Sequence, residues 1–418
     1  MGVFLSKLII TILSSLVIWV GASAQADSFW QNLAQKRTES RWLFAGILVF
    51  RLLPFVFVYG LLNEMPRGDV PFFWGKTQVA YQGGMVYQDF VSYHAPLFTY
   101  ILAFPLHFWY SSKAIVLLMV AIESLLVFAT YRLYKTERPD AFKSALLYLI
   151  LSAPLIMVLL GGQEDIWFWG VALLMLWYFK RYQKDGKGMG AIFSTGLLAI
   201  KVTFVFWLFP LILVLKNRVS FLAALATVGA LSAGLLYYLE GTAFLMPLQM
   251  TDNLLSPNLY TISRPFLALA LGHTPPLTLF SWVGLVLTIL VAIWLAFQIR
   301  HWTLDKSMPL IFIVTYATMT VIMPTSPGYY AFTYLLPFVF EIIDWHKRRE
   351  VAMLLLINVL LVTQPFLFTY LQSPNYEDIT VLKKPLYLLE YTLQIVNVAA
   401  FGWVLFVTFQ KAKRPQVC

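Results

Sequence analysis

Long runs of apolar residues, separated by short charged segments, repeat along almost the whole chain. Helices of about 20 apolar residues cross a bilayer, so the pattern predicts an all-α, polytopic bundle of transmembrane helices. The clearest span is 42–62, preceded by Lys36, Arg37 and Arg41. We expect about ten to eleven spans. The others cover residues 114–131, 144–160, 166–179, 221–238, 277–298, 309–322, 329–343, 351–370 and 387–409, with an N-terminal segment.

Residues 191–215 interrupt this alternation. Lys201 stands in the middle of the run and Pro210 breaks it, and basic residues flank both ends, with Lys187 before it and Lys216 after it. A single crossing would move Lys216 and every later basic cluster to the outer face. Because Lys and Arg favour the cytoplasmic side, we expect a re-entrant hairpin that enters and leaves on that side.

The sequence predicts two regions. Residues 1–41 form an N-terminal hydrophobic segment and a cytoplasmic linker, and residues 42–418 form a single transmembrane domain with an external loop at 63–113. Within this polar, aromatic-rich loop, residues 96–110 are apolar but too short to cross, which favours a short interfacial or re-entrant helix on the outer face. Residues 4–20 with Ala22-Ser23-Ala24 look like a signal peptide. Cleavage would leave the basic residues near position 37 outside, so we expect an uncleaved helix.

Composition supports a membrane protein. Of 418 residues, 60% are hydrophobic and 12% are charged, against about 25% charged in soluble domains. The net charge of +10 comes from Lys and Arg in short segments between apolar runs, the positive-inside pattern, so it does not indicate nucleic-acid binding. The only cysteine, Cys418, excludes a disulfide framework and a cysteine metal site in this sequence.

Acidic residues near helix ends on the predicted outer face are the first candidates for chemistry. Asp69 follows a span and adjoins the aromatic Phe72-Phe73-Trp74, where shielding would raise its pKa and make it a general base. Asp165 opens a span after two glycines that allow a ligand to approach the backbone. A favourable helix-dipole interaction explains an acid there equally well, and Glu164 is the weaker candidate.

Charges inside apolar segments are the second group. Lys201 lies at membrane depth, where a lysine is expensive and suggests a functional role, with a lipid phosphate as the obvious anion. Snorkelling of its long side chain to the interface is the alternative. Glu123 lies inside the span 114–131, where a structural ion pair and a functional role are both open.

Single polar residues complete the candidates. His94 precedes Ala95-Pro96, a rigid corner, and could bind a phosphate or a sugar. A structural role is the alternative. Tyr329 opens a span, as interfacial belt residues also do. Arg264 is a lone base on the predicted outer face that could meet a phosphate. The sequence contains no zinc spacing, P-loop, dinucleotide loop or nucleophile elbow.

These residues, in this order, resemble the GT-C superfamily of integral-membrane glycosyltransferases. The resemblance is to the branch with the GPI mannosyltransferase catalytic subunit and the bacterial polyprenol-phosphate-mannose-dependent transferases. It covers residues 42–343. Its motifs are Asp69 after the first long span, Gly83-Gly84 to Tyr87 with Asp89-Phe90, Tyr93 to Leu97, Gly162 to Asp165, Ala199 to Lys201 with 207–211, and Tyr329-Tyr330 to Phe338.

The resemblance implies an inverting transfer of a sugar, mannose by the branch, from a polyprenyl- or dolichyl-phosphate donor to a glycan or lipid-linked acceptor. Asp69 would be the general base, and Lys201, with His94 or Arg264, would hold the donor phosphate. Asp165 and Glu164 would orient sugar hydroxyls. The motif residues Tyr93, Asp89 and Tyr329 join the predicted substrate-binding set.

No cofactor is expected with certainty. Many family members carry a D-x-D pair, whereas here Val70-Pro71 follows Asp69, so a divalent cation is open but unsupported, and no metal ligand is assigned. The predicted partners are the lipid-linked donor, the acceptor and membrane lipids. The membrane would be the plasma membrane of a prokaryote, with the site outside, or the endoplasmic reticulum of a eukaryote. A transporter or flippase of lipid-linked sugars and a non-catalytic scaffold are the alternatives.

Overall fold

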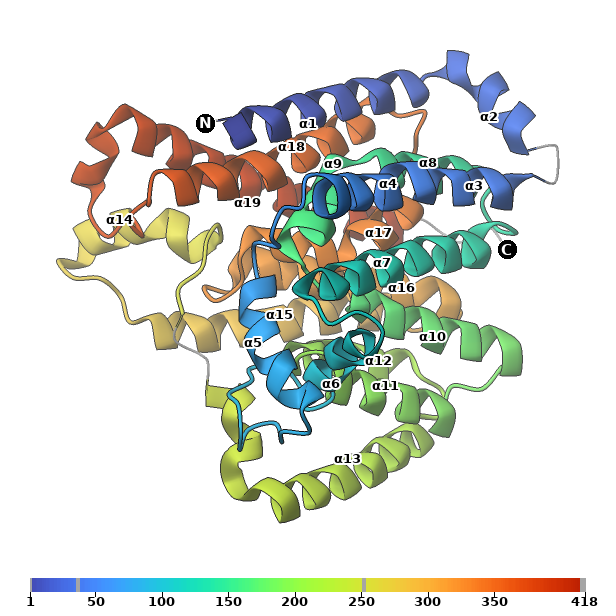
Figure 1. The fold of residues 1–418 in the computed structure, drawn as a ribbon, viewed down its shortest axis with the longest axis vertical. Coiled ribbons are helices and arrows are strands. Elements are labelled where there is room, and N and C mark those ends of the chain that lie inside the picture. The colour runs from blue at the N-terminus through green and yellow to red at the C-terminus, as the bar shows by residue number, and fades with distance from the viewer. Residues whose placement is uncertain (1, 35–37, 250–252, 414–418) are drawn as a thin grey trace.

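The computed structural model describes residues 2–34, 38–249 and 253–413, and within these ranges the chain is all-α with no strand. Lys36 and Arg37, two of the basic residues that orient the first span, lie outside these ranges, as does Cys418. The long helices lie roughly side by side. Helix α1 lies along one edge of the bundle and α13 along the opposite edge, while α19 lies near α1, with α18 between them (Figure 1).

The N-terminal segment is part of the bundle. Helix α1 (Gly2–Gly21) is followed by α2 (Asp27–Ala34), and the chain bends by 74° between them. Ser152 Oγ donates a hydrogen bond of 2.9 Å to Thr11 Oγ1, and Asn358 Nδ2 donates one of 3.3 Å to Ser15 Oγ. These polar contacts inside an apolar bundle fix α1 against its neighbours. Retention of this helix stays a prediction.

The first long span is continuous from Glu39 to Leu61 and includes α3 (Glu39–Ile47) and α4 (Leu53–Phe55). Arg51, at its middle, is fully buried and forms a two-pronged ion pair with Glu123 of α7 (Ser112–Tyr134), at 2.5 and 2.8 Å. Glu123 therefore has the basic partner that a structural role requires. Arg51 could have been predicted as this partner, because it is a lone arginine inside an apolar run.

Three short helices fill the predicted loop at 63–113, namely α5 (Val70–Tyr81), α6 (Phe98–Ala103) and the 3₁₀ turn η4 (Phe104–His107). The short helix expected at 96–110 is present as α6 and η4. Helix α5 had no counterpart among the expected elements. Asp69 is its N-cap residue and Pro71 lies in its first turn, where proline is well tolerated in helices.

The next two elements bring the chain back to the candidate site. Helix α8 (Ala141–Ile150) and the segment Ser152–Gly161, which begins with α9 (Ser152–Ile156), form a pair bent by 53°. A left-handed Gly162 ends this segment, and α10 (Trp167–Tyr182) leaves in a new direction. The turn at 162–166 thus lies between two helices, next to the start of α5.

Residues 187–214 form a hairpin, whereas its entry and exit on the cytoplasmic side stay a prediction. Helix α11 (Lys187–Ala199) runs to a break at Ile200 and Lys201, and the 3₁₀ turn η6 (Val202–Trp207) and α12 (Leu208–Val214) return. The Asp185 carboxylate accepts hydrogen bonds from the backbone N–H of Lys216, at 2.5 Å, and from the backbone N–H and side-chain amide of Asn217. The two ends of the hairpin therefore meet, and Lys201 lies at its far turn.

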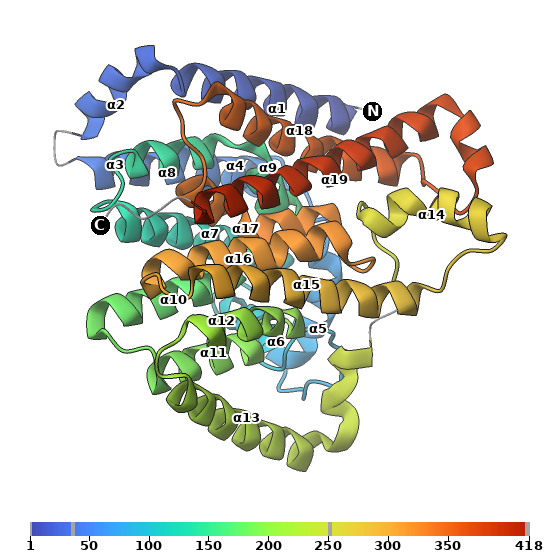
Figure 2. The same cartoon turned by 180° about the vertical axis from the view of Figure 1, so that it is seen from behind.

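The remaining helices surround a buried centre. Helix α16 is buried along almost its whole length and packs against α15, α17 and α19 (Figure 2). The elements of this part are α13 (Arg218–Glu240), η7 (Gly241–Gln249), α14 (Leu259–Leu271), α15 (Leu277–Ile299), α16 (Leu304–Ile322), η8 (Gly328–Ala331), α17 (Phe332–Glu341), α18 (Arg348–Tyr370) and α19 (Pro385–Ala412).

The chain is a multi-pass membrane protein, but with fewer spans than expected. Within the described residues, six helices are long and apolar enough to cross a membrane, or up to eight if each bent pair is one span. The expected number of ten to eleven included α10, α16 and α17. Helix α10 has 16 residues and α17 has 10, short of the roughly 17 to 25 residues of a span. Helix α16 is long enough, with 19 residues, but is not among the helices that are apolar enough to count.

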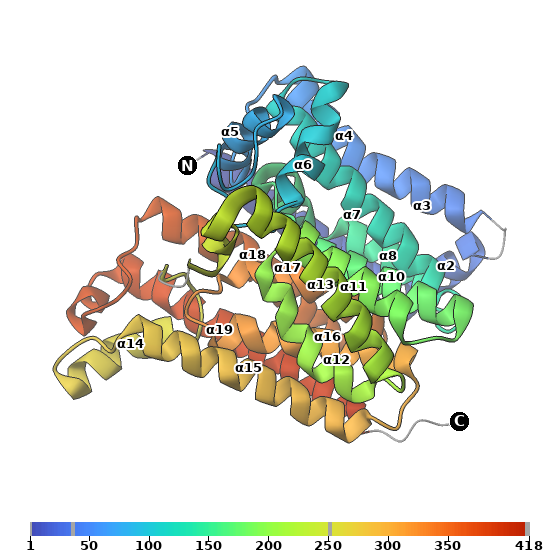
Figure 3. The ribbon, with the colours of Figure 1, turned by 90° about the horizontal axis from the view of Figure 1, so that it is seen from below.

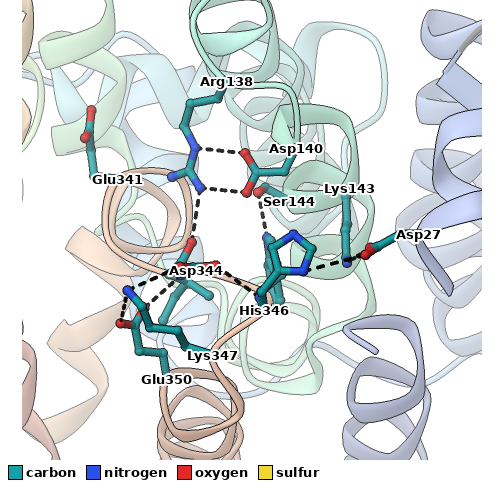
Figure 4. A network of polar contacts seen from close by, with 12 residues as sticks. Asp27, Arg138, Asp140, Lys143, Ser144, Glu341, Asp344, His346, Lys347 and Glu350 are labelled. Carbon is teal, nitrogen blue, oxygen red and sulfur yellow. Dashed lines mark hydrogen bonds and ion pairs between the residues drawn. The ribbon is translucent and has the colours of Figure 1, made fainter. Parts of the chain in front are cut away.

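Basic residues gather at one end of the bundle, which we call the basic end. There Arg138 donates to both oxygens of Asp140, at 2.9 and 2.7 Å, and Lys143 pairs with Asp27 at 2.9 Å (Figure 4). This network joins α2 to the connections before α8 and α18. Lys180, Lys216 and Arg300 belong to helix ends on the same side. The hairpin turn with Lys201 lies at the opposite end.

Candidate functional site

The site begins where two backbone turns touch. The Asp69 N–H donates a 3.0 Å hydrogen bond to the Gly161 carbonyl. Gly68 and Gly162 both have left-handed φ values, of +64° and +65°. A Cβ on Gly68 would lie 2.4 Å from the Gly161 oxygen, and one on Gly162 would lie 2.3 Å from Val70 Cγ2. Glycine is therefore required on both sides of this contact, which places Asp69 beside the 163–165 turn.

Asp69 presents its carboxylate to this turn. Although it is the N-cap residue of α5, its side chain makes no capping bond and accepts instead from Gln163 Nε2 at 2.8 Å. Burial, together with the negative charge of Glu164, raises the pKa of Asp69. A half-buried carboxylate with a raised pKa is suited to take a proton, as expected for a general base.

Lys201 joins the two acids of the turn. Its Nζ lies 2.5 Å from Glu164 Oε1 and 3.0 Å from Asp165 Oδ1. Both acids are buried, and the Lys201 side chain is only 15% exposed. Because its ammonium is held by two carboxylates and does not extend to the surface, snorkelling does not describe this lysine.

The two acids differ in their titration. Burial opposes the ionisation of Glu164, but the Lys201 ammonium and the hydrogen bond from His94 outweigh it and hold the pKa of this carboxyl well below its usual range. For Asp165, burial prevails over the same ammonium and raises the pKa to about 7. One lysine therefore supports a firmly ionised Glu164 and an Asp165 that can carry a proton near neutral pH.

The hairpin break positions the His94 corner. The N–H groups of Ala95 and Leu97 donate to the carbonyls of Ile200 and Leu198, at 3.0 and 2.9 Å. These carbonyls are available because α11 ends at Ala199. The corner that the sequence predicted at Ala95-Pro96 is thereby attached directly to the Lys201 turn.

His94 connects Glu164 to Lys76, which was not among the predicted site residues. Its Nε2 lies 2.9 Å from Glu164 Oε1, and its Nδ1 lies 3.2 Å from Lys76 Nζ. Since an ammonium only donates, Nδ1 accepts and Nε2–H donates to Glu164. The ring stacks on Phe98 at 4.1 Å. Burial lowers the pKa of His94 to about 4, so the neutral ring is the form present at pH 7.

Lys76 is buried among aromatic rings. Its ammonium lies 4.6 Å from the ring centre of Phe72, 5.1 Å from that of Phe73 and 5.4 Å from that of Phe98. Burial lowers its pKa to about 8. Within the described residues it contacts no carboxylate, so two of its three N–H donors remain for another acceptor. In the sequence, Lys76 could have been noticed as a lysine inside an aromatic stretch. It was missed because residues 70–81 were not expected to form a helix.

Three acceptors in the turn lack a hydrogen-bond partner in the described part of the chain. They are Gln163 Oε1, Glu164 Oε2 and Asp165 Oδ2, from three consecutive residues, and all three atoms are buried. A buried acceptor without a donor costs roughly 1 to 3 kcal/mol. Such groups call for a partner that brings hydrogen-bond donors, either bound water or a ligand. No group of three or more His, Cys, Asp or Glu residues that could hold a metal ion occurs among the described residues.

Two aromatic predictions lie at the edge of the cluster. Tyr93 stacks on Phe72, the ring beneath Lys76, with centroids 6.4 Å apart. Tyr329 packs edge-on against Tyr330 at 5.4 Å. It is Tyr330 whose ring lies under the Lys201 ammonium, 5.0 Å away. Of the two tyrosines in the motif that begins at Tyr329, Tyr330 is therefore the one that contacts the site.

Two predicted residues are engaged elsewhere. Asp89 accepts from the Met85 N–H at 2.6 Å and closes its own loop. Arg264, on α14, donates to Glu377 at 2.6 Å and to the Asn375 carbonyl at 3.1 Å. Figures 1 and 3 place α14 at a different edge of the molecule from α5. Neither residue contacts the cluster formed by Asp69, Glu164, Asp165, Lys201 and His94.

An apolar groove is lined by sequence neighbours of the cluster residues, although none of the cluster residues themselves lines it. It has a volume of about 1000 Å³, lies between α7, α10 and α11, and is lined at the site by Ile101, Trp167 and Ile200. Trp167 follows the acid turn by two residues, and Ile200 precedes Lys201. The indole Nε1–H of Trp167 is buried and lacks an acceptor in the described residues. A long apolar ligand with an oxygen-bearing head would satisfy both features.

No protein-family model matches this chain, and no curated protein matches it.

Proposed function

We propose that this protein is a GT-C-type membrane glycosyltransferase. It would move a sugar, mannose according to the resemblance, from a polyprenyl or dolichyl phosphate to a glycan or lipid-linked acceptor. The observation that carries the proposal is the convergence of Asp69, Glu164, Asp165 and Lys201, from three separate segments, around three unpartnered buried acceptors.

A sugar supplies what those acceptors lack. Each hydroxyl is a donor, and several hydroxyls project from one ring at spacings that neighbouring acceptors can match. Glu164 Oε2 and Asp165 Oδ2 would accept from the transferred sugar, and Gln163 Oε1 would accept from a hydroxyl close to Asp69. These roles agree with those that the resemblance assigns to Asp165 and Glu164.

A lipid-linked donor accounts for the groove. Its apolar walls suit an isoprenoid chain, which would bring the attached phosphate to Trp167 and to the Lys201 turn. Lys201 and Lys76 lie on opposite sides of His94 and Glu164, and Lys76 keeps spare donors. Two cations near one phosphate would stabilise the negative charge that develops as it leaves.

The proposed reaction is a single displacement. The acceptor hydroxyl gives its proton to Asp69 while its oxygen attacks the anomeric carbon, and the bond from that carbon to the phosphate oxygen breaks. The polyprenyl phosphate leaves with the electron pair, and the configuration at the carbon inverts. Asp69 later releases its proton to water. Its raised pKa makes it a stronger base than an exposed aspartate.

Charge distribution supports the orientation that we propose. The basic end, with Arg138 and Lys143, lies opposite the cluster, and this end would face the cytoplasm. The cluster would then face the outside in a prokaryotic plasma membrane, or the lumen of the endoplasmic reticulum in a eukaryote. The short helices α5 and α6 would lie at that outer face.

A transporter of lipid-linked sugars is the second candidate. The same groove extends from Trp167 to Arg132 and Lys180, towards the basic end, as a path across the membrane would. The two functions differ in whether the bond between sugar and phosphate breaks.

One experiment separates these functions. Purified protein in liposomes receives radiolabelled polyprenyl-phosphate-mannose and unlabelled lipids extracted from membranes that lack the protein. The transferase predicts release of free polyprenyl phosphate in step with label in a new product. Movement of intact donor to the other leaflet, without release, would indicate the transporter. Neither event, in protein that remains folded, would contradict both functions.

A further inference from the structure

A second polar cavity lies at the basic end, far from the candidate site. It has a volume of about 450 Å³ and lies between the carboxyl ends of α10 and α12 and the connection from α15 to α16. Helix α12 packs along α15, which brings these ends together (Figure 2). The charged residues and the histidine in its lining are Lys180, Asp185, Lys216, Arg300, His301 and Asp305.

The acids and one of the cations of this lining already have partners. Asp185 binds the backbone N–H groups of Lys216 and Asn217 and, within the described residues, forms no ion pair with the Lys216 ammonium. Asp305 lies in the first turn of α16, where a carboxylate stabilises the helix amino end. Lys180 pairs with Glu137, which also binds Lys306.

Lys216 and Arg300 keep their charges for a ligand. Neither forms an ion pair within the described ranges. The Arg300 guanidinium stacks on Phe297, 4.1 Å from the ring centre, which leaves its in-plane N–H donors uncovered. Cations favour helix carboxyl ends, which explains why basic residues gather here. It does not explain a cavity between them.

The cavity lies at the level where the apolar helices end. Helix α15 is a candidate span that ends at Ile299, one residue before Arg300. Phe179, Val214 and Trp302 supply apolar walls, and Phe297, beneath Arg300, is largely exposed on the outside of the span. A ligand held here would have its charge in the cavity and apolar surface beside it.

We infer that this cavity binds the phosphate group of an anionic phospholipid, with Lys216 and Arg300 as its principal donors. The headgroup would occupy the space between the helix ends, and the acyl chains would run along α15. Basic pockets between transmembrane helices on the cytoplasmic side suit such headgroups. A soluble phosphate shares the chemistry but would not use the adjoining apolar surface. The site lies at the opposite end from the proposed transferase site and does not depend on it.

The test compares two double variants of the full chain. Lys216→Ala/Arg300→Ala removes the two unpaired cations, and Arg181→Ala/Lys184→Ala removes the same charge from exposed residues on the same side, outside the cavity lining. Purified, delipidated protein is titrated with phosphatidylglycerol or phosphatidylcholine, and bound lipid is counted by native mass spectrometry. A parallel titration with sodium phosphate at constant ionic strength follows the thermal midpoint.

The inference predicts that wild type and the Arg181/Lys184 variant retain phosphatidylglycerol in preference to phosphatidylcholine. Lys216→Ala/Arg300→Ala should bind it roughly thirtyfold more weakly, since each basic residue near an anionic lipid contributes about 1 kcal/mol. Equal losses in both variants, or equal retention of the two lipids by wild type, would overturn the site. Stabilisation by phosphate without retention of phosphatidylglycerol would overturn the lipid assignment. If Lys216→Ala/Arg300→Ala unfolds without lipid, Lys216→Gln takes its place. The preference of Lys216→Gln for phosphatidylglycerol over phosphatidylcholine must then be weaker than that of wild type.

Discussion

Within one cluster, neighbouring carboxyl groups acquire different properties. Burial raises the pKa values of Asp69 and Asp165, while Lys201 and His94 reverse the effect of burial at Glu164. Sites that separate the pKa values of adjacent acids assign them different tasks. In the proposed reaction, Asp69 accepts a proton, whereas the ionised Glu164 anchors Lys201 and the sugar.

His94 should make the folded state sensitive to acid. Burial lowers its pKa from 6.5 to about 4, so between these values the unfolded chain binds more protons than the folded chain. Stability from this residue is therefore present above pH 6.5 and is lost as the pH falls towards 4. In His94→Gln this contribution is absent. We expect the difference in thermal midpoint between wild type and His94→Gln to shrink as the pH falls from 6.5 to 4. A constant difference would contradict a buried, neutral histidine.

At the scale of elements, the contact between two turns determines where Asp69 lies. Gly68→Ala adds a Cβ 2.4 Å from the Gly161 oxygen, at a left-handed φ of +64°. Gly272→Ala is the control, because its φ of +73° is equally unfavourable but nothing lies within 4 Å of the new Cβ. Both changes carry about 1 to 2 kcal/mol of backbone strain. Only Gly68→Ala should displace Asp69 and lower the transfer rate, measured at matched amounts of folded protein. Equal rates in the two variants would exclude this positioning role.

The Arg51–Glu123 pair joins the first span to α7 inside the bundle. Glu123→Leu leaves a buried guanidinium without its partner and should destabilise the protein by roughly 3 to 5 kcal/mol. Arg51→Leu/Glu123→Leu removes both charges and should recover most of that loss. Thermal unfolding of the single and double variants in one detergent tests the coupling. A stable Glu123→Leu protein without transfer activity would instead give Glu123 a functional role.

The sequence predicted the elements and residues whose signals are local. Asp69, Glu164, Asp165 and Lys201 stand out because charged residues near or inside apolar helices are rare. Lys76 was missed because its role depends on α5 facing the His94 corner, a tertiary arrangement. The span count was too high because the apolar runs of the sequence did not show where each helix ends, and α10 and α17 are too short to cross. Arg264 and Asp89 are engaged by Glu377 and Met85, partners that sequence spacing does not reveal.

In the molecule as a whole, the cluster and the basic end lie at opposite ends of the bundle. This arrangement predicts opposite exposure in the membrane. In a Cys418→Ser background, Glu64→Cys should react with a membrane-impermeant maleimide in intact cells. Lys184→Cys should react only after permeabilisation. Both positions are exposed, so access to the reagent alone decides the result. The reverse labelling pattern would place the cluster in the cytoplasm and contradict the proposed orientation.

In the proposed reaction, Asp69 is the base of a sugar transfer at this cluster. The most direct test is the initial rate of label transfer from polyprenyl-phosphate-mannose by wild type, Asp69→Asn and Glu64→Gln, at equal amounts of folded protein. Glu64 is an exposed acid five residues earlier, and its one ion pair among the described residues is with the exposed Arg67. We expect Asp69→Asn to lose roughly 10² to 10⁴ of the rate and Glu64→Gln to keep the wild-type rate. Wild-type transfer by Asp69→Asn would contradict the account.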